Sequence, residues 1–292
     1  MNGFLLVNKK KGYSSNEIVQ KIKKKFSLNK VGHLGTLDPD AEGLLIIAIN
    51  RATKFSNYFL NSDKSYYVEI KLGKSTTTDD VSGEITEEFE VKCSEDEVKK
   101  EINNFLGKSF QKPPFFSALK YKGKPLYKYA RKGEFINKEP REIEIKEIKN
   151  ISYKDKICSF QILCSKGTYI RSIARDLGKN LGCGGHMFYL KRLSQHKFNL
   201  LDAHTIEELS LERTIKIDDF FKDYEKLSLN EESLKIFLNG GRVFLNKDIT
   251  KDLRIYSEDN DFIGLGRLEN SYLKHKQPVS YTHLTLPTIC SV

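Results

Sequence analysis

The chain has 292 residues and a mass of 33.6 kDa, a length that predicts about two domains. Hydrophobic residues make up 39% of it and charged residues 30%, which excludes both a disulfide-stapled mini-protein and a disordered chain. The longest apolar run, Leu44 to Ile49, is much shorter than the roughly 20 residues that cross a bilayer. The start of the chain also lacks the basic region of a signal peptide, so we expect a cytoplasmic protein with no membrane partner.

The charge balance favours a polyanionic partner. Lys and Arg number 49 against 39 Asp and Glu, which gives a net charge of +10 and a pI near 9.1. A merely lysine-rich composition explains the same balance. The five cysteines contain no CxxC pair and the six histidines no HExxH motif, so we predict reduced thiols and no metal site.

Hydrophobic spacing and capping signals predict the elements of the first 60 residues. A short buried strand is predicted at 4–8, and Ser14 with Glu17 forms a capping box ahead of a helix. One face of this helix is apolar and the other is rich in lysine. A loop rich in turn residues at 32–43 then precedes an apolar strand at 44–49.

Strands and helices alternate irregularly in the following residues. In chain order we predict strands at 66–72 and 84–91, paired with each other around a polar connection of Thr, Asp and Gly residues, and then a helix at 94–105 that begins with a capping box of Ser94 and Glu97. A second strand pair at 143–151 and 157–164 follows, and then a helix at 169–181 that Gly182 stops. There is no strict βαβ rhythm. The pattern therefore predicts the α+β class, with a mixed, mainly antiparallel sheet flanked by helices.

The character of the sequence changes near residue 225. We expect a main domain at 1–222 and a small, mostly β unit at 223–277. Within the small unit, a short helix is predicted at 228–238, followed by strands at 253–257 and 262–268. Residues 278–292 contain no Lys, Arg, Asp or Glu, and we expect them to be a non-native or disordered tail.

Residues 111–132 combine cations with aromatic rings. The segment has seven basic residues, no acidic residue and five aromatic residues, and prolines interrupt it. Cations that contact phosphates, together with aromatic faces for stacking, are typical of RNA binding. A solvated loop whose aromatic side chains pack into the core is the alternative.

The glycine-rich loop at 32–43 holds a candidate catalytic carboxylate. Asp38 precedes Pro39, which disfavours helical backbone angles at the aspartate. A carboxylate on a rigid loop between apolar elements is suited to catalysis. Asp-Pro is also a common turn pair, so the residues alone leave both interpretations open.

Arg171 lies one turn into the helix predicted at 169–181. On a partly apolar helix, its guanidinium could reach a buried carboxylate and keep it ionised. An exposed surface arginine fits the spacing equally well.

Five blocks of the sequence resemble the motifs of one known family. The loop GHLGTLDPDAEGLL is similar to the signature around the catalytic aspartate in the TruB family of tRNA pseudouridine synthases. In family order, the other similar blocks are LLVNKKKGYSSN, SDKSYYVEIKLGKSTTTDDVSG, QKPPFFSALKYKGKPLYKYAR, and CSKGTYIRSIARDLG with GHMFYLKRL. The resemblance covers about residues 3 to 210, and one departure is Lys10, where the family usually has proline.

The resemblance implies a pseudouridine synthase fold and a role for each matching residue. Asp38 matches the catalytic aspartate and Arg171 the arginine paired with it, and Tyr66 matches the tyrosine that packs on the target base. The other implied substrate-binding residues are His33, Tyr169, Leu190 and Lys9. Residues 109–141 match an RNA-gripping insertion, and residues 223–277 weakly resemble a PUA-like RNA-binding domain.

The implied reaction is isomerisation of the T-loop uridine of tRNA, at position 55, to pseudouridine. It adds no group to the RNA, so no cofactor is expected. The stacked uridine must flip out of its loop before it reacts. The expected partner is the T-arm of tRNA, with neither a guide RNA nor an obligate protein partner.

Three other functions remain open at this point. A non-catalytic RNA-binding protein is disfavoured by the set Asp38, Tyr66 and Arg171, and a guide-RNA-dependent enzyme resembling dyskerin by the long basic insertion. A glycosidase is disfavoured because most use two carboxylates, and one stands out here. The sequence leaves open whether Asp38 attacks the sugar, attacks the base or takes a proton.

Overall fold

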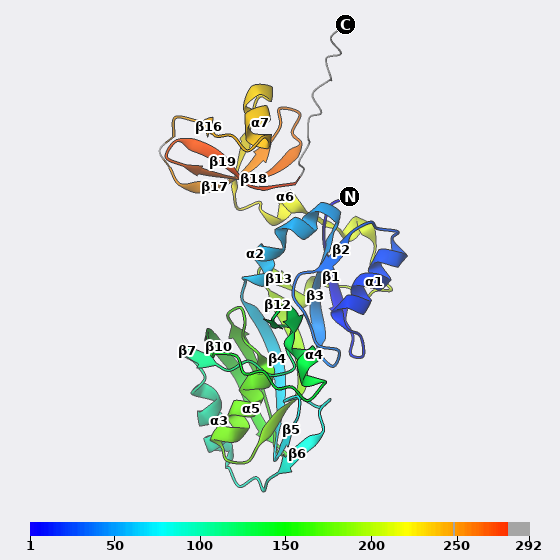
Figure 1. Ribbon diagram of the computed structural model, residues 1–292, viewed down its shortest axis with the longest axis vertical. Coiled ribbons are helices and arrows are strands. Elements are labelled where there is room, and N and C mark those ends of the chain that lie inside the picture. The colour runs from blue at the N-terminus through cyan, green and yellow to red at the C-terminus, as the bar shows by residue number, and fades with distance from the viewer. Residues whose placement is uncertain (248, 280–292) are drawn as a thin grey trace.

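The computed structural model describes residues 1–247 and 249–279 (Figure 1). Its main part is a ten-stranded sheet in which β12 and β3 are parallel and the other neighbours antiparallel. The strand order is β14 (Ile215–Lys216), β1 (Gly3–Lys9), β3 (Glu42–Ile49), β12 (Gly185–Gln195), β4 (Lys64–Leu72), β11 (Ile157–Cys164), β10 (Arg141–Lys154) and β7 (Gly107–Gln111), with β2 (Val31–His33) on β3 and β13 (Phe198–Asn199) on β12. The mixed, mainly antiparallel sheet predicted from the sequence is thus confirmed.

Three amphipathic helices cover one face of this sheet. They are α1 (Ser15–Lys25), α3 (Glu95–Asn103) and α5 (Ile170–Asn180), and their buried side chains share one core with the strands. Both predicted capping boxes form, at Ser14 with Glu17 and at Ser94 with Glu97. Burial of the apolar stripe supplies most of the stability of such short helices.

A second core lies on the opposite face of the sheet. It combines alternate residues of β1 and β3 with aromatic side chains from α2 (Ser56–Leu60) and α6 (Ile217–Phe220). Phe59 and Phe220 stack in it with their ring centroids 4.5 Å apart. Leu265 and Val279 of the C-terminal unit belong to the same core, so that unit packs against the main sheet.

The pairing of strands 66–72 and 84–91 was predicted wrongly. β4 lies at the centre of the sheet between β11 and β12, whereas β6 (Ile85–Glu88) pairs with β5 (Lys74–Thr76) in a separate hairpin. The reason is burial. Alternate residues of β4 are fully buried and need neighbours on both edges, whereas every residue of β6 is exposed.

The C-terminal unit is a five-stranded sheet with its own small core. Its order is β15 (Glu225–Ser228), β17 (Lys251–Tyr256), β18 (Phe262–Glu269), β19 (Tyr272–Pro278) and β16 (Val243–Phe244), and α7 (Glu231–Leu238) packs on it. The helix begins later than predicted because Ser228 ends a strand and Asn230 is the N-cap. Val279 is buried, so ordered chain continues past the expected domain end at 277, and residues 280–292 of the expected tail lie outside those described.

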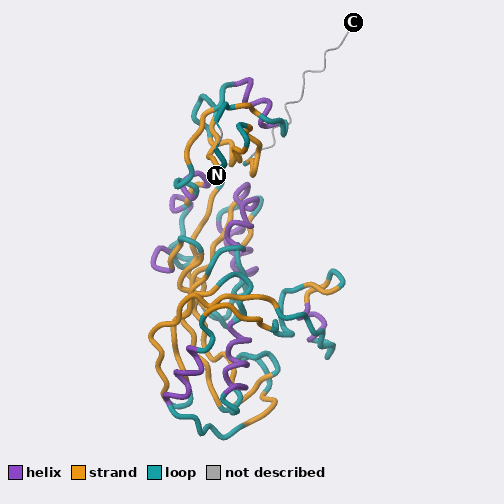
Figure 2. Tube along the Cα trace, turned by 90° about the vertical axis from the view of Figure 1, so that its left-hand side faces the viewer, coloured by secondary structure: helices purple, strands orange, loops and turns teal. Residues whose placement is uncertain are grey.

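The residues between β7 and β10 leave the sheet as an arm. This arm, residues 112–140, carries the hairpin β8 (Lys120–Tyr121) and β9 (Lys124–Pro125) and the short helix α4 (Leu126–Ala130), and it projects to the right in Figure 2. Across the described residues, none of the helices has the length and apolarity needed to cross a membrane.

Candidate active site

A cavity of about 810 Å³ opens where the loop at 36–40 meets the sheet and the arm. Its wall also includes the start of α1, Tyr66 of β4, the start of α5 and residues 116–118 of the arm. The volume suits a ligand of nucleotide size. Of the seven residues predicted to form the site, Asp38, His33, Tyr66, Tyr169, Arg171 and Leu190 line this cavity, and Lys9 does not.

Buried neighbours on both sides fix the loop that carries Asp38. Leu37 and Ala41 anchor it in the core, and the Ser15 hydroxyl both donates to the carbonyl of Leu37, at 2.9 Å, and accepts from its N–H, at 2.8 Å. The carbonyl of Asp38 accepts from the N–H of Ala41 at 3.1 Å. The carboxylate itself remains 37% exposed, so it is held rigidly and is open to the cavity.

Arg171 connects Asp38 to two other parts of the site. Its Nε lies 3.1 Å from Oδ2 of Asp38 and its Nη1 lies 3.5 Å from Oδ2 of Asp80, while its Nη2 donates to the carbonyl of Phe116 at 2.9 Å. The arginine is 8% exposed. The structure therefore places it as a buried partner of the carboxylate and not on the surface.

Asp80 is a component of the site that the sequence analysis missed. Its side chain is buried, and its Oδ1 accepts hydrogen bonds from the hydroxyl of Thr78 and from the N–H and hydroxyl of Ser82. These bonds orient the carboxylate while its other oxygen faces Arg171. The Thr, Asp and Gly residues of this segment predicted a polar connection between strands. No local signal showed that the segment folds back onto α5.

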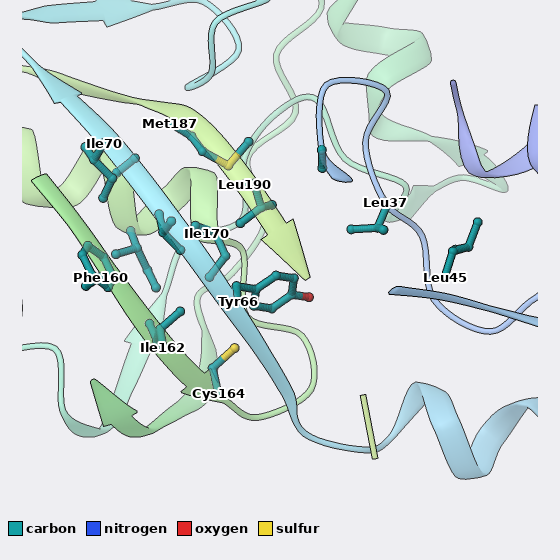
Figure 3. Packing of buried hydrophobic residues seen from close by; sticks show 14 of the residues in the cluster. Leu37, Leu45, Tyr66, Ile70, Phe160, Ile162, Cys164, Ile170, Met187 and Leu190 are labelled. Atoms are coloured by element: carbon teal, nitrogen blue, oxygen red, sulfur yellow. The ribbon is translucent and has the colours of Figure 1, made fainter. Parts of the chain in front are cut away.

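Apolar side chains surround the ring of Tyr66 (Figure 3). Leu190 and Ile170 lie beside it, and the hydroxyl points away from the core towards the side where Leu37 lies. Burial raises the pKa of Tyr66 to about 12, so the phenol is neutral at pH 7. This arrangement presents a rigid aromatic group at the edge of the cavity.

Tyr169 links the start of α5 to the base of the arm. The residue is the N-cap of α5, and its backbone N–H and carbonyl both bond to the side-chain amide of Gln111, at 2.8 and 3.0 Å. The guanidinium of Arg141 lies over its ring, 5.5 Å from the ring centroid. Both contacts fix the tyrosine at the cavity wall.

His33 contributes an imidazole to the cavity from β2. Burial lowers its pKa, and the positive charge of Arg192 lowers it further, so the ring is neutral at pH 7. Its Nδ1 is buried without a hydrogen-bond partner. That nitrogen has no exposed surface, so a ligand in the cavity would meet the remaining, partly exposed part of the ring.

The structure does not bring Lys9 to the cavity. Its side chain is buried behind the loop, where Nζ donates to the carbonyls of Tyr13 at 2.7 Å, Lys10 at 3.2 Å and Pro39 at 3.3 Å. Burial lowers its pKa to about 8. Contact with substrate was implied for this lysine, but its geometry is that of a support for the Asp38 loop.

Two further residues near the loop come from β12 and escaped the sequence analysis. The side-chain amide of Gln195 donates to the carbonyls of Leu34, at 2.6 Å, and Phe59, at 3.0 Å, and Arg192 is also buried there. A polar residue in a strand is normally taken for a surface residue, so no local signal marked either one.

Within residues 1–247 and 249–279, no group of three or more metal-ligating side chains is placed to hold an ion.

Comparison with known families identifies the family of the chain. Residues 23–170 match the family described as "TruB family pseudouridylate synthase (N terminal domain)". Residues 171–227 match "tRNA pseudouridylate synthase B C-terminal domain", and residues 226–276 match "Pseudouridine synthase II TruB, C-terminal". The chain belongs to the TruB family of pseudouridine synthases. The predicted family and isomerase class are thereby confirmed.

Curated relatives extend this similarity over most of the chain. The TruB protein of Clostridium kluyveri, named tRNA pseudouridine synthase B, is 42% identical over 275 residues, which is 91% of this chain and 95% of the relative. A protein of the same name from Clostridioides difficile is 40% identical and spans 96% of this chain and 97% of its own length.

Solved structures share the fold at lower identity. A chain in "Crystal Structure of a Cbf5-Nop10-Gar1 Complex" has a TM-score of 0.69 and 21% identity, covering 95% of this chain and 85% of its own. A chain in "Structure of H/ACA RNP bound to a substrate RNA containing 2'-deoxyuridine" has a TM-score of 0.68 and 18% identity, with the same coverage. At this identity the likeness supports the TruB fold and no more.

Proposed function

We propose that this chain isomerises the T-loop uridine of tRNA, at position 55, to pseudouridine, with Asp38 as the catalytic residue. Family membership and the names of the relatives support the reaction and the tRNA substrate. The observation that supports the role of Asp38 most directly is its geometry. A partly exposed carboxylate faces a nucleotide-sized cavity, held by a buried arginine at 3.1 Å.

The reaction assigns a task to each group in the cavity. The bond between uracil N1 and ribose C1′ breaks, the base turns, and a bond forms between C5 and C1′, after which the C5 proton is lost and N1 gains one. Charge develops at the sugar carbon when the glycosidic bond breaks, and a carboxylate such as Asp38 stabilises or traps it. Arg171 orients that carboxylate through the ion pair at 3.1 Å. No atom is added, so the chemistry requires no cofactor.

The remaining cavity residues hold the extruded base. The ring of Tyr66 packs on one face of the uracil, and Leu190 and Tyr169 complete the wall. His33 contacts the RNA next to the extruded uridine through the exposed part of its ring. Extrusion unstacks the uridine, and these contacts compensate for the missing stacking.

The arm and the C-terminal unit bind the rest of the tRNA. The seven cations of 111–132 are exposed, or nearly so, and form no ion pair among the described residues, so they are available to phosphates. The C-terminal sheet acts as a PUA-like RNA-binding unit. We place the activity in the cytoplasm and expect neither a guide RNA nor an obligate protein partner.

The test is incubation of the purified chain with an unmodified tRNA transcript, with no other RNA or protein present. Chemical mapping at single-nucleotide resolution should detect pseudouridine at position 55 and nowhere else in the T-arm. Modification at a different position would contradict the assigned substrate. Absence of modification would instead support the guide-dependent or non-catalytic alternative, and addition of a guide RNA would separate these two.

A further inference from the structure

Arg192, in the middle of β12, is a fully buried cation that forms no ion pair with a carboxylate within the described residues. It is 1% exposed and is the largest of the fully buried side chains. A guanidinium does not lose its proton in a protein, so this residue brings a positive charge into the interior. Burial of an unpaired charge is unfavourable for folding, and such a residue is expected where it serves a function.

The guanidinium of Arg192 holds the loop of Asp38 on both sides. Its Nη2 donates to the carbonyl of Gly35 at 3.0 Å, and its Nη1 reaches the carbonyl of Thr36 at 3.5 Å. Its Nε donates to the carbonyl of Leu44, beyond the other end of the loop, at 2.7 Å. One planar group therefore fixes the separation of the two loop ends.

The backbone of Arg192 also contacts the loop end, at Gly43. These two residues are partners in the parallel register of β12 and β3. Gly43 has a φ of +100°, and a Cβ there would lie 2.3 Å from the carbonyl oxygen of Arg192. No other residue type fits this close approach without a shift of the backbone. The C-terminal end of the loop is thus held against β12, the strand that provides the guanidinium.

The charge of Arg192 reaches the cavity residues around Asp38. Burial raises the pKa of Tyr66, and the positive charge of Arg192 opposes that rise. Burial lowers the pKa of His33, and the same charge lowers it further. Arg192 is therefore close enough to both cavity residues to act on them, although it does not line the cavity itself.

We propose that Arg192 is a positioning residue for the reaction, which holds the Asp38 loop in its productive geometry by spanning the carbonyls of Gly35 and Leu44. This inference rests on the proposed function. A positioning role differs from a purely structural role in one respect. Loss of the span should displace Asp38 relative to the bound uridine, and therefore lower the turnover rate more than it lowers RNA affinity or stability.

The test compares Arg192→Lys and Arg192→Gln with the wild-type chain. Lysine keeps the charge but not the planar fork, and glutamine keeps two N–H donors but not the charge. Single-turnover rates at saturating tRNA are measured well below the unfolding temperature, with the active fraction determined by stoichiometric tRNA titration. We expect both variants to lose at least 30-fold in rate while the Kd for tRNA changes less than threefold.

Phe160→Leu is the matched control for reduced stability. Phe160 is buried in β11 of the same sheet and does not line the cavity. This variant should unfold at a lower temperature and keep a rate near wild type. A rate for Arg192→Lys within threefold of wild type would overturn the inference, as would a loss of rate in the Phe160 control equal to that of the arginine variants.

A second variant approaches the same contact from the loop. A Cβ on Gly35 would lie 3.0 and 3.1 Å from the side-chain amide of Gln195 and 3.2 Å from Nη1 of Arg192, so Gly35→Ala presses on both side chains without removing the guanidinium. If the Arg192 variants do not fold, this variant should show the same selective loss of rate, and a wild-type rate in it would overturn the inference. An inactive wild-type chain would instead contradict the proposed function, which keeps the two failures distinct.

Discussion

Arg171 joins the Asp38 loop to the arm through a single guanidinium. Its Nε lies 3.1 Å from the carboxylate of Asp38, and its Nη2 donates to the carbonyl of Phe116 in the arm at 2.9 Å. Because the arginine is buried, both contacts are stronger than they would be in water. A displacement of the arm at Phe116 should therefore move Arg171 and change its contact with the carboxylate of Asp38.

Replacement of Asp38 by asparagine should abolish turnover and leave RNA affinity nearly unchanged. The two side chains are almost the same size, but asparagine has no charge to stabilise the sugar carbon. Single-turnover assays should show a loss of at least 1000-fold, with the Kd for tRNA within threefold of wild type. Turnover within tenfold of wild type would remove Asp38 from the catalytic role.

Replacement of Arg171 by lysine should lower the turnover rate by about 100-fold. One ammonium group cannot reproduce the three directions in which the guanidinium contacts Asp38, Asp80 and Phe116. The measurement is the rate at saturating tRNA. Arg175→Lys is a suitable control, because Arg175 lies on the next turn of α5 and pairs with Asp79 and Asp176 instead. A fully active Arg171→Lys variant would show that the contact with Asp38 is dispensable.

Local signals predicted the parts of the fold that depend on neighbouring residues. The capping boxes at Ser14 and Ser94 and the stop at Gly182 all form, because each needs a few adjacent residues. The strand pairing of 84–91 was wrong because pairing depends on partners distant in the sequence. Asp38 and Arg171 meet across more than 130 residues, and family resemblance, not spacing, indicated that they do.

The buried polar residues mark the limit of prediction from sequence. Lys9 and Arg192 both have charged side chains, which composition assigns to the surface, yet both are fully buried against backbone carbonyls. A carbonyl acceptor has no side-chain signature. Nothing in the sequence pattern therefore distinguishes a lysine that supports a loop from one that contacts RNA.

Replacement of Lys9 by methionine should change how stability depends on pH between about 8 and 10.5. Burial lowers the folded-state pKa of Lys9 to about 8, while in the unfolded chain the pKa has its ordinary value of 10.5. In this window the unfolded state binds a proton that the folded state has released, so the contribution of Lys9 to stability rises with pH. As the pH rises, the free energy of unfolding of the wild type should increase relative to that of the variant by at most about 1.4 kcal/mol per pH unit.

Urea unfolding of both chains at several pH values measures this difference. Other lysines and tyrosines titrate in the same range, but they are common to the two chains and cancel in the comparison. A stability difference that stays constant from pH 8 to 10.5 would show that the pKa of Lys9 is not lowered by burial.

Neutralisation of three lysines in the arm should weaken tRNA binding and reduce its salt dependence. Lys120, Lys122 and Lys124 lie on or beside the β8–β9 hairpin and are exposed. Removal of each cation that binds a phosphate should reduce the slope of log Kd against log salt by roughly 0.7 to 0.9, because fewer counterions are released. Replacement of all three by glutamine should leave thermal stability nearly unchanged, since exposed lysines contribute little to folding.

The aromatic residues of the arm make this prediction specific to the cations. The ring centroids of Tyr121 and Tyr129 lie 5.9 Å apart, and those of Phe115 and Phe135 lie 5.2 Å apart. These rings therefore pack within the arm and hold its shape.

The matched control replaces three exposed lysines outside the arm, Lys154, Lys156 and Lys179, by glutamine. This control changes the net charge equally and should keep the wild-type affinity and slope. Because Asp38 is untouched, the arm variant should also keep the wild-type turnover rate at saturating tRNA. Equal weakening in the two triple variants would show that overall charge, and not the arm, attracts the RNA.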